Sequence, residues 1–417
     1  MDFKHIVVLS ILVVYFYDLI LAIMREFSSR NPIPENVSDV YDGPTYAKWR
    51  AYHEEKVRHR IWILTAGFLV EHTLIELNVY HAFSTLFPEN EFLQMFSVLL
   101  LLSASELLMI PFTYYDTMVI EGKYGFNKTK KSTFWADQIK EFVIGLLVLI
   151  GIGELLTWSH RMLGDWLILA FAVVMTLFAL VTAFLYPVFS RIFNKFTPLE
   201  DGELKDRVTA LLNSHGYKVR AIKVMDASRR TTKANAYFTG FGKMKTIVLF
   251  DNLVRTMTVD EICAVFAHEM GHGLHRDTLK NQILTFVQMA ILSVLAWLTV
   301  RHIGAFTPFG FTSVNYGFAL VLIIYVEFDL LSPLFRLLVN KVSRNAEYRA
   351  DRQVVDEGYA DAMISALKKL ARENFSNLAP SPALVALEYS HPTLSQRIDA
   401  INKAVRCETA AQECQNM

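Results

Sequence analysis

Residues 5–24, HIVVLSILVVYFYDLILAIM, form an apolar run that contains a single acidic residue, Asp18. A helix that crosses a bilayer needs about 20 apolar residues, and this run has that length. A secretory signal peptide has a shorter apolar centre followed by a small-x-small cleavage site, and this run has neither feature. We therefore predict that it is a first membrane-spanning helix.

The composition of the whole chain agrees with a membrane protein. Of its 417 residues, 53% are hydrophobic, and the mean hydropathy is +0.29. Basic and acidic residues balance at 41 each, so the charge gives no reason to expect nucleic acid as a partner. The three cysteines, Cys263, Cys407 and Cys414, form no Cys-x-x-Cys pair and no disulfide framework.

Apolar runs of spanning length recur along the chain and alternate with polar stretches. We predict four regions: membrane helices one to five with their loops in 1–190, a polar region in 191–280, helices six and seven in 281–340, and a second polar region in 341–417. We expect the two polar regions to pack together. The seven predicted spans are 5–24, 61–87, 92–119, 138–158, 165–189, 281–301 and 316–339.

The loops between these spans differ in charge. Residues 25–60 carry seven Lys or Arg and 120–137 carry four Lys, whereas the intervening loops are acidic or nearly uncharged. Basic loops remain in the cytoplasm. The pattern therefore places the N-terminus outside and both polar regions in the cytoplasm. Depending on the organism, the membrane is the bacterial inner membrane or that of the endoplasmic reticulum.

Several predicted spans contain polar residues that are costly at membrane depth unless they meet protein or water. One interpretation is pairing between helices or a position near the ends of the spans. The other is a water-filled cavity among the helices, and the residues alone leave both open. The residues are Glu71, His72, Glu76, Glu106, Glu154, Glu327 and Asp329.

The polar region 191–280 contains the motif AHEMGHGLHRD at 267–277. Thr258 and Glu261 form a capping-box pattern, so a helix should begin near residue 259. His268 and His272 then lie one turn apart on one face and can bind one metal ion. Glu269 lies next to the first ligand, where it can take a proton from water. His275 lies too far along the helix to bind the same ion, so we expect it to have a structural or supporting role.

A catalytic zinc site needs a third protein ligand, and SRNAEYRADRQ at 343–353 offers one. Glu347 and Asp351 lie four residues apart on a predicted helix. Glu347 can bind zinc, and Asp351 can accept the outer N–H of a ligand histidine. Taken alone, the same pattern would also fit a solvated helix face with ion pairs.

Two further stretches hold candidate site residues. ANAYFTGFGKMKTIVLF at 234–250 predicts two short strands, and an edge strand there could pair with an extended peptide beside Asn235. EYSHPTLSQRIDAI at 388–401 offers His391 and Arg397, which could stabilise an oxyanion. By spacing alone, an ordinary turn asparagine and a surface histidine at a helix start are the favoured explanations for these residues.

The chain resembles the type I CAAX prenyl proteases, which are membrane zinc endopeptidases. The resemblance rests on EGKYGFNK at 121, FNKFTPLEDGELK at 193, NAYFTGFGKMKTIVLFDNL at 235, HEMGH at 268, RNAEYRAD at 344 and YSHPTLSQRI at 389. It implies a mostly α-helical protein with seven membrane helices around a large water-filled chamber. A gluzincin-like zinc protease domain with a small β-sheet would cap this chamber.

The resemblance also implies roles for the residues and for partners. His268, His272 and Glu347 would bind one Zn²⁺ ion and Glu269 would be the catalytic base. Asp351 would support a ligand, Asn235 would hold substrate backbone, and His391 and Arg397 would support the transition state.

The expected substrate is a peptide or protein with a prenylated C-terminal CAAX sequence, acted on by a monomer surrounded by membrane lipid. Two alternatives remain open: a quality-control protease for membrane proteins without prenyl groups, and an inactive scaffold or channel. An intramembrane protease fits less well, because polar residues flank the motif on both sides.

Overall fold

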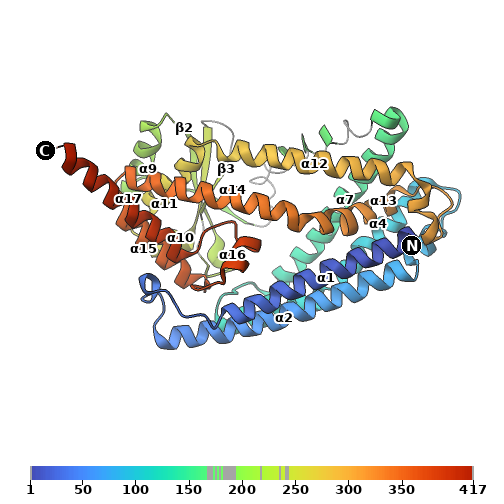
Figure 1. The fold of residues 1–417 in the computed structure, drawn as a ribbon, viewed down its shortest axis with the longest axis horizontal. Coiled ribbons are helices and arrows are strands. Elements are labelled where there is room, and N and C mark those ends of the chain that lie inside the picture. Colours follow the sequence, from blue (N-terminus) through green and yellow to red (C-terminus); the bar gives the residue numbers. More distant parts are fainter. Residues whose placement is uncertain are drawn as a thin grey trace.

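The computed structural model describes residues 2–166, 172–173, 176–177, 180–181, 194–216, 218–233, 236–239 and 244–415. Over these residues the protein is mostly α-helical with one small β-sheet, as predicted. It is elongated, with long helices extending from a half that contains the sheet (Figure 1). The predicted fifth span, 165–189, lies largely outside the described residues.

Within the described residues, five helices or helical runs are long and apolar enough to cross a membrane. They are α1 (Phe3–Ser28), Glu91–Tyr124, α7 (Lys131–Leu163), Leu279–Arg301 and Tyr316–Asp356. The second run comprises α4 (Glu91–Leu107), α5 (Ile110–Tyr114), a π-helical turn at Tyr115–Ile120 and α6 (Glu121–Tyr124). Leu279–Arg301 is most of α12 (Asp277–Arg301). The last run comprises α13 (Tyr316–Leu322), a π-helical turn at Ile323–Phe328 and α14 (Asp329–Asp356).

The predicted second span, 61–87, corresponds to the end of α2 (Gly43–Glu76) together with α3 (Val79–Ser84). Helix α2 has 34 residues and begins far before the predicted span, because the side chain of Asp42 caps its N-terminus by accepting a hydrogen bond from the N–H of Thr45. It lies alongside α1 over much of its length (Figure 1). Helix α2 is too polar to be counted among the five apolar runs. These five runs alone therefore do not account for seven spans.

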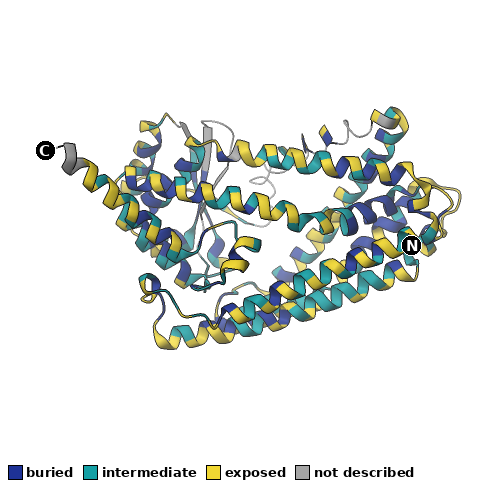
Figure 2. Ribbon diagram, viewed as in Figure 1, coloured by how far each residue is buried: buried dark blue, intermediate teal, exposed yellow. Residues whose placement is uncertain are grey.

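Large apolar side chains are exposed along one stripe of α1. Leu9, Val13, Phe16 and Ile20 follow one another at helical spacing, and each is about half exposed. In a soluble protein such a stripe would be unfavourable, whereas it is the surface that lipid requires. Exposed residues also alternate with buried ones along the other long helices (Figure 2).

The core of the membrane half is an apolar cluster in which α4 and α13 meet α1 and α12. The contact between α4 and α13 depends on Gly317, since a β-carbon there would lie 2.6 Å from the carbonyl oxygen of Met95. Small residues allow membrane helices to approach this closely.

The polar half contains a four-stranded sheet in the order β1-β2-β4-β3. The two strands predicted in 234–250 are present as β3 and β4, which pair antiparallel, while β2 runs parallel to β4. This topology leaves β3 as an edge strand. The strands are β1 (Phe196–Pro198), β2 (Lys218–Met225), β3 (Ala236–Thr239) and β4 (Met244–Phe250).

One apolar core contains residues that precede the last two membrane helices in the chain and residues that follow them. Val208, Leu249 and Phe266 share it with Val354 and Ala366. The two polar regions therefore pack together, as expected. The helices of this half are α9 (Glu203–Ser214), α10 (Asp251–Thr256), α11 (Val259–Leu274), α15 (Ala360–Glu373), α16 (Pro382–Glu388) and α17 (Leu394–Gln415).

The first loop also belongs to this half. Val37, Tyr41 and Trp49 pack with Leu378 and Ile398 in a separate core, although the sequence assigns them to a connection between spans. The hydroxyl of Tyr41 donates to the backbone carbonyls of Ala371 and Ser376, and the indole N–H of Trp49 donates to that of Phe375.

Candidate metal centre

Helix α11 carries the two histidines of the motif and begins where the sequence predicts. Thr258 Oγ1 accepts a hydrogen bond from the N–H of Glu261, and the Glu261 carboxylate accepts one from the N–H of Thr258, so the capping box is confirmed. The same carboxylate also accepts hydrogen bonds from Lys369 and Ser365 of α15. Burial would raise the pKa of Glu261, but these hydrogen bonds hold it below its usual value.

Helices α11 and α14 approach closely at Gly271, inside the motif. A β-carbon at Gly271 would lie 2.9 Å from the Cα atom of Ala350 and 3.1 Å from the Cβ atom of Gln353. The absence of a side chain therefore lets α14 pass directly over α11. This contact brings the carboxylate of Glu347 to the two histidines, which lie about 80 residues earlier in the chain.

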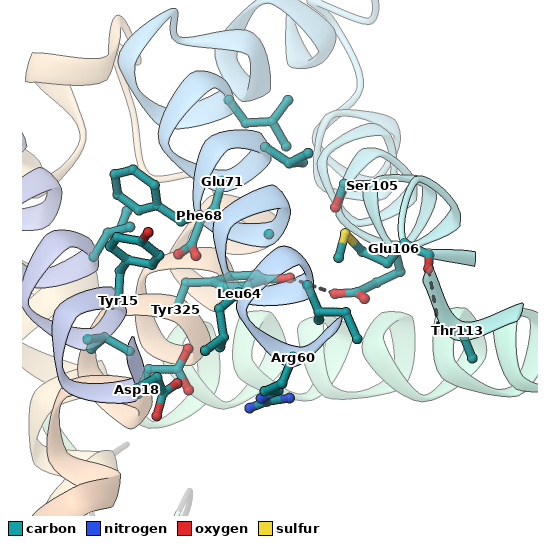
Figure 3. Close-up of a pocket in the computed structure, with 18 of the residues that line it drawn as sticks. Tyr15, Asp18, Arg60, Leu64, Phe68, Glu71, Ser105, Glu106, Thr113 and Tyr325 are labelled. Atoms are coloured by element: carbon teal, nitrogen blue, oxygen red, sulfur yellow. Dashed lines mark hydrogen bonds between the residues drawn. The ribbon is translucent and has the colours of Figure 1, made fainter. Parts of the chain in front are cut away.

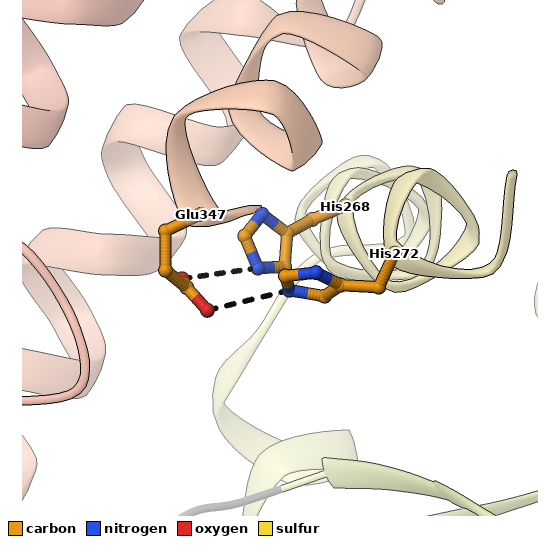
Figure 4. A group of neighbouring side chains, drawn as sticks. All are labelled: His268, His272 and Glu347. Carbon is orange, nitrogen blue, oxygen red and sulfur yellow. Dashed lines mark ion pairs between the residues drawn. The ribbon is translucent and has the colours of Figure 1, made fainter. Parts of the chain in front are cut away.

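His268, His272 and Glu347 form one compact group in which the possible ligand atoms all lie within 4.8 Å of one another. His268 Nε2 lies 3.4 Å from Glu347 Oε2, and His272 Nε2 lies 3.3 Å from Glu347 Oε1 (Figure 4). His268 and Glu347 are buried, and His272 is half-buried. Within the described part of the chain, this is the cluster that has metal-ligand geometry.

The surroundings of the three side chains fit a metal ion. Glu347 Oε2 is buried and has no hydrogen-bond partner among the described residues, which would be costly for a carboxylate oxygen that binds nothing. Both Nε2 atoms face this carboxylate, while both Nδ1 atoms are engaged by other acids. Two imidazole nitrogens and one carboxylate are a donor set typical of catalytic zinc.

Asp351 holds the first of these histidines. Its Oδ1 atom lies 2.9 Å from His268 Nδ1, and the guanidinium of Arg397 donates to both oxygens of Asp351, at 2.9 and 2.6 Å. Burial and the positive charge of Arg397 act to lower the pKa of His268. The hydrogen bond with Asp351 and the close approach of the Glu347 carboxylate outweigh them and raise it to about 9.

Asp277 holds the second histidine. Its Oδ2 atom lies 3.2 Å from His272 Nδ1, while Lys280 and Arg349 donate to Oδ1 at 3.0 and 2.7 Å. Arg276 lies between α11 and α12 in the left-handed conformation, with a φ of 56°. It turns the chain so that the carboxylate of Asp277 lies next to His272. In the sequence, Asp277 appears only as an acid five residues after the second histidine. Its contact with His272 depends on the break between α11 and α12.

Glu269 and His391 lie beside the cluster. Glu269 is half-buried, and no residue in the described ranges donates a hydrogen bond to its carboxylate. His391 Nε2 lies 3.3 Å from Glu347 Oε1, its Nδ1 lies 2.9 Å from Ser390 Oγ, and its side chain is 61% exposed. Desolvation lowers the pKa of His391, and the nearby Glu347 carboxylate acts in the opposite direction.

The other predicted residues, Arg397, Asn235 and His275, lie in three different settings. Arg397 is buried against Asp351, and its Nη1 atom lies 3.4 Å from Glu347 Oε2. Asn235 lies outside the described residues, directly before β3. His275 is the exposed residue that caps the C-terminus of α11, where its backbone N–H donates a hydrogen bond to the carbonyl of Gly271.

Known proteins resemble this chain along nearly its whole length. The model of Peptidase family M48 matches residues 198–405, and that of the CAAX prenyl protease N-terminal region, described as five membrane helices, matches residues 23–195. The CAAX prenyl protease 1 homolog of Arabidopsis thaliana is 31% identical over 96% of this chain and 97% of its own. CAAX prenyl protease 1 of Saccharomyces cerevisiae is 30% identical over 90% of this chain and 89% of its own.

A solved structure has the same fold. The crystal structure of S. mikatae Ste24p superposes with a TM-score of 0.86 at 29% identity, and the match covers 96% of this chain and 99% of that one. Both polar regions and the membrane helices are therefore included in the match.

Proposed function

Because this chain belongs to peptidase family M48 and carries the CAAX prenyl protease N-terminal region, we infer that it cleaves proteins that end in a prenylated CAAX sequence. It is an integral membrane metalloendopeptidase. The observation that carries the proposed metal-dependent cleavage is the cluster of His268, His272 and Glu347 on two closely packed helices. The names of the relatives support the choice of substrate.

We propose zinc as the metal, with one ion bound by His268 Nε2, His272 Nε2 and the carboxylate of Glu347. When bound, it supplies Lewis acidity to the attacking water and to the carbonyl of the scissile bond. Asp351 and Asp277 orient the two imidazole rings through their Nδ1 atoms, which fixes the tautomer that leaves Nε2 free.

The protein groups then handle the protons. Glu269 accepts a proton from the attacking water and later delivers it to the leaving amine, since it directly follows the first ligand in the chain and its carboxylate has no partner among the described residues. His391, whose exposed side chain lies beside Glu347, donates a hydrogen bond to the developing oxyanion. Arg397 acts through Asp351 and Glu347, because its guanidinium is already paired with the first and lies close to the second.

The substrate backbone is proposed to pair with the edge strand β3. This strand has β4 on one side, and Asn235 comes immediately before it. An extended peptide added to such an edge forms main-chain hydrogen bonds that do not depend on its sequence. Asn235 would contribute a side-chain hydrogen bond at the start of that strand.

We propose seven membrane spans around a water-filled chamber, with the metal centre on the cytoplasmic side. Cavities of about 530, 450 and 510 Å³ adjoin one another among the membrane helices. The first shares Glu106 and Tyr325 with the second and Arg60 with the third. The two chain ends lie at opposite ends of the long axis (Figure 1), which agrees with the sidedness from the loop charges. We propose that the protein works as a monomer.

The test uses purified protein and two peptides that end in the same CAAX sequence, one farnesylated at its cysteine and one not. We expect cleavage after the cysteine of the farnesylated peptide and slower cleavage of the other. Glu269→Gln protein is the control for a contaminating protease. Equal rates for both peptides would favour a protease for unmodified membrane proteins, and no cleavage of either would contradict the proposed activity.

A further inference from the structure

The cavity of about 530 Å³ lies at membrane depth, where α1, α2, α4 and the start of α14 meet, and it is strongly acidic (Figure 3). Four carboxylates line it, whereas Arg60 is the one positively charged residue in its described lining. These acids come from four separate elements, so the chain has brought them together by folding. They are Asp18, Glu71, Glu106 and Asp329.

Most of these carboxylates have no hydrogen bond or close ion pair among the described residues, although Arg60 and Arg336 attract Asp18 and Arg336 attracts Asp329. Glu106 accepts a hydrogen bond from the hydroxyl of Tyr325 at 3.0 Å. For Asp18, Glu71 and Asp329, the described residues provide neither a hydrogen-bond donor nor an ion pair, and Glu71 Oε1 is fully buried. Arg336, seven residues beyond Asp329 on α14, does not line the cavity. Carboxylates at this depth are unfavourable unless they meet water or a positive charge.

Aromatic side chains provide a second, independent feature. Tyr80 lines the cavity with a side chain that is only 2% exposed, and its hydroxyl has no hydrogen bond to any described residue. Tyr15 and Phe68 stack on the wall, with ring centroids 4.5 Å apart. Carboxylates combined with aromatic faces and an unpaired phenol hydroxyl suit an organic cation, which gains both charge and cation–π attraction.

We propose that this cavity binds a lysine or arginine side chain of the peptide substrate. The inference rests on the proposed endopeptidase function and adds a specificity subsite to it. Figure 3 shows Asp18, Glu71 and Glu106 around the cavity, with the guanidinium of Arg60 at about the level of Asp18 in this view. Arg60 opposes the bound cation, so it sets an upper limit on the affinity.

Helix α14 fixes the distance between this subsite and the scissile bond. Asp329 in the cavity and Glu347 at the metal centre lie on α14, 18 positions apart, which corresponds to about 27 Å along a helix. An extended peptide covers about 3.3 Å per residue. Allowing roughly 6 Å for the reach of a long side chain, the basic residue should lie about six to eight residues from the scissile bond.

The test measures binding and not cleavage. A peptide series that ends in the CAAX sequence places a single lysine between two and twelve residues before the scissile bond, and each peptide is paired with one that has norleucine at that position. Zinc-loaded Glu269→Gln protein binds the peptides without cutting them. We expect the lysine peptide to bind about tenfold more tightly than its norleucine partner only near six to eight residues, a ratio typical of one close charge pair.

Variants of the cavity sharpen this test. The double variant Glu71→Gln, Glu106→Gln should abolish the preference for lysine, and Arg60→Gln should increase it. The double variant Glu89→Gln, Glu200→Gln is the matched control, since both are exposed acids outside the cavity lining and their loss changes the net charge equally. Thermal unfolding and zinc content show that each variant is folded.

Two results would overturn the proposal. One is a lysine preference that is absent at every position or that survives in the double variant. The other is stabilisation of the protein by tetramethylammonium chloride, lost in the double variant, without any lysine preference, which would assign the cavity to a free cation or a lipid headgroup. Failure of the native enzyme to cleave peptides would contradict the proposed activity and leave this binding measurement unaffected.

Discussion

At the level of single residues, Glu269 separates metal binding from proton transfer. We predict that Glu269→Gln lowers kcat by about 10²–10⁴-fold while the protein keeps its metal, because Glu269 lies outside the three-ligand cluster. Peptide turnover and elemental analysis of the same sample test this. Glu347→Ala is the contrasting variant and should lose metal as well as activity. Near-normal turnover of Glu269→Gln would show that another group is the base.

His391 should act on the transition state more than on substrate binding. Its side chain is largely exposed beside Glu347. We predict that His391→Ala lowers kcat by about 10²–10³-fold with a much smaller change in KM, as when an oxyanion donor is lost. Steady-state kinetics with one peptide substrate measure both constants. An unchanged kcat would leave His391 as a surface residue at a helix start.

Metal binding should weaken as the pH falls. Because the pKa of His268 is raised to about 9, a proton must leave this ring when a metal binds at any pH below that value. The affinity should therefore rise by about tenfold per pH unit for each histidine proton released, and level off near pH 9. Titration of metal-free protein with zinc between pH 6 and 9 tests this. An affinity independent of pH would contradict the proposed ligands.

At the level of elements, the crossing of α11 and α14 decides the geometry of the centre. We predict that Gly271→Ala destabilises the protein by about 1–3 kcal/mol, because the new methyl group would meet the backbone of Ala350. It should also weaken metal binding, since Glu347 moves with α14. Thermal unfolding and zinc affinity are the two measurements.

The control for this variant is Gly151→Ala in α7. A β-carbon at Gly151 meets nothing within 4 Å, so the substitution should be neutral or slightly stabilising in a helix interior. If both variants behaved alike, the close approach at Gly271 would not matter for the centre.

At the level of the whole molecule, the proposed water-filled chamber would make the acidic residues of the membrane half accessible to water. We predict that cysteines placed at Glu71 and Glu106 react with a small water-soluble maleimide after the three native cysteines are replaced. Both residues line the cavity. A cysteine at Val13, on the exposed apolar stripe of α1, should not react when the protein is in a bilayer. Protection of both cavity positions in active protein would indicate a packed bundle.

The sequence by itself determined the features that depend on local spacing. Spanning length and hydropathy predicted α1, and the capping box predicted the start of α11, because each depends on residues within a few turns. The spacing of His268 and His272 placed both on one face for the same reason. Glu347 could be predicted as a ligand only because the short pattern around it was read together with the motif that contains His268 and His272.

The tertiary structure decided what depends on distant contacts. Asp277 reaches His272 because Arg276 breaks the helix, and Arg397 reaches Asp351 because α17 folds back on α14. The loop after α1 joins the polar half through Tyr41 and Trp49, and α2 begins within this loop, well before the predicted second span. None of these contacts leaves a local periodic signal, since the energy that selects them comes from burial and pairing between residues far apart in the chain.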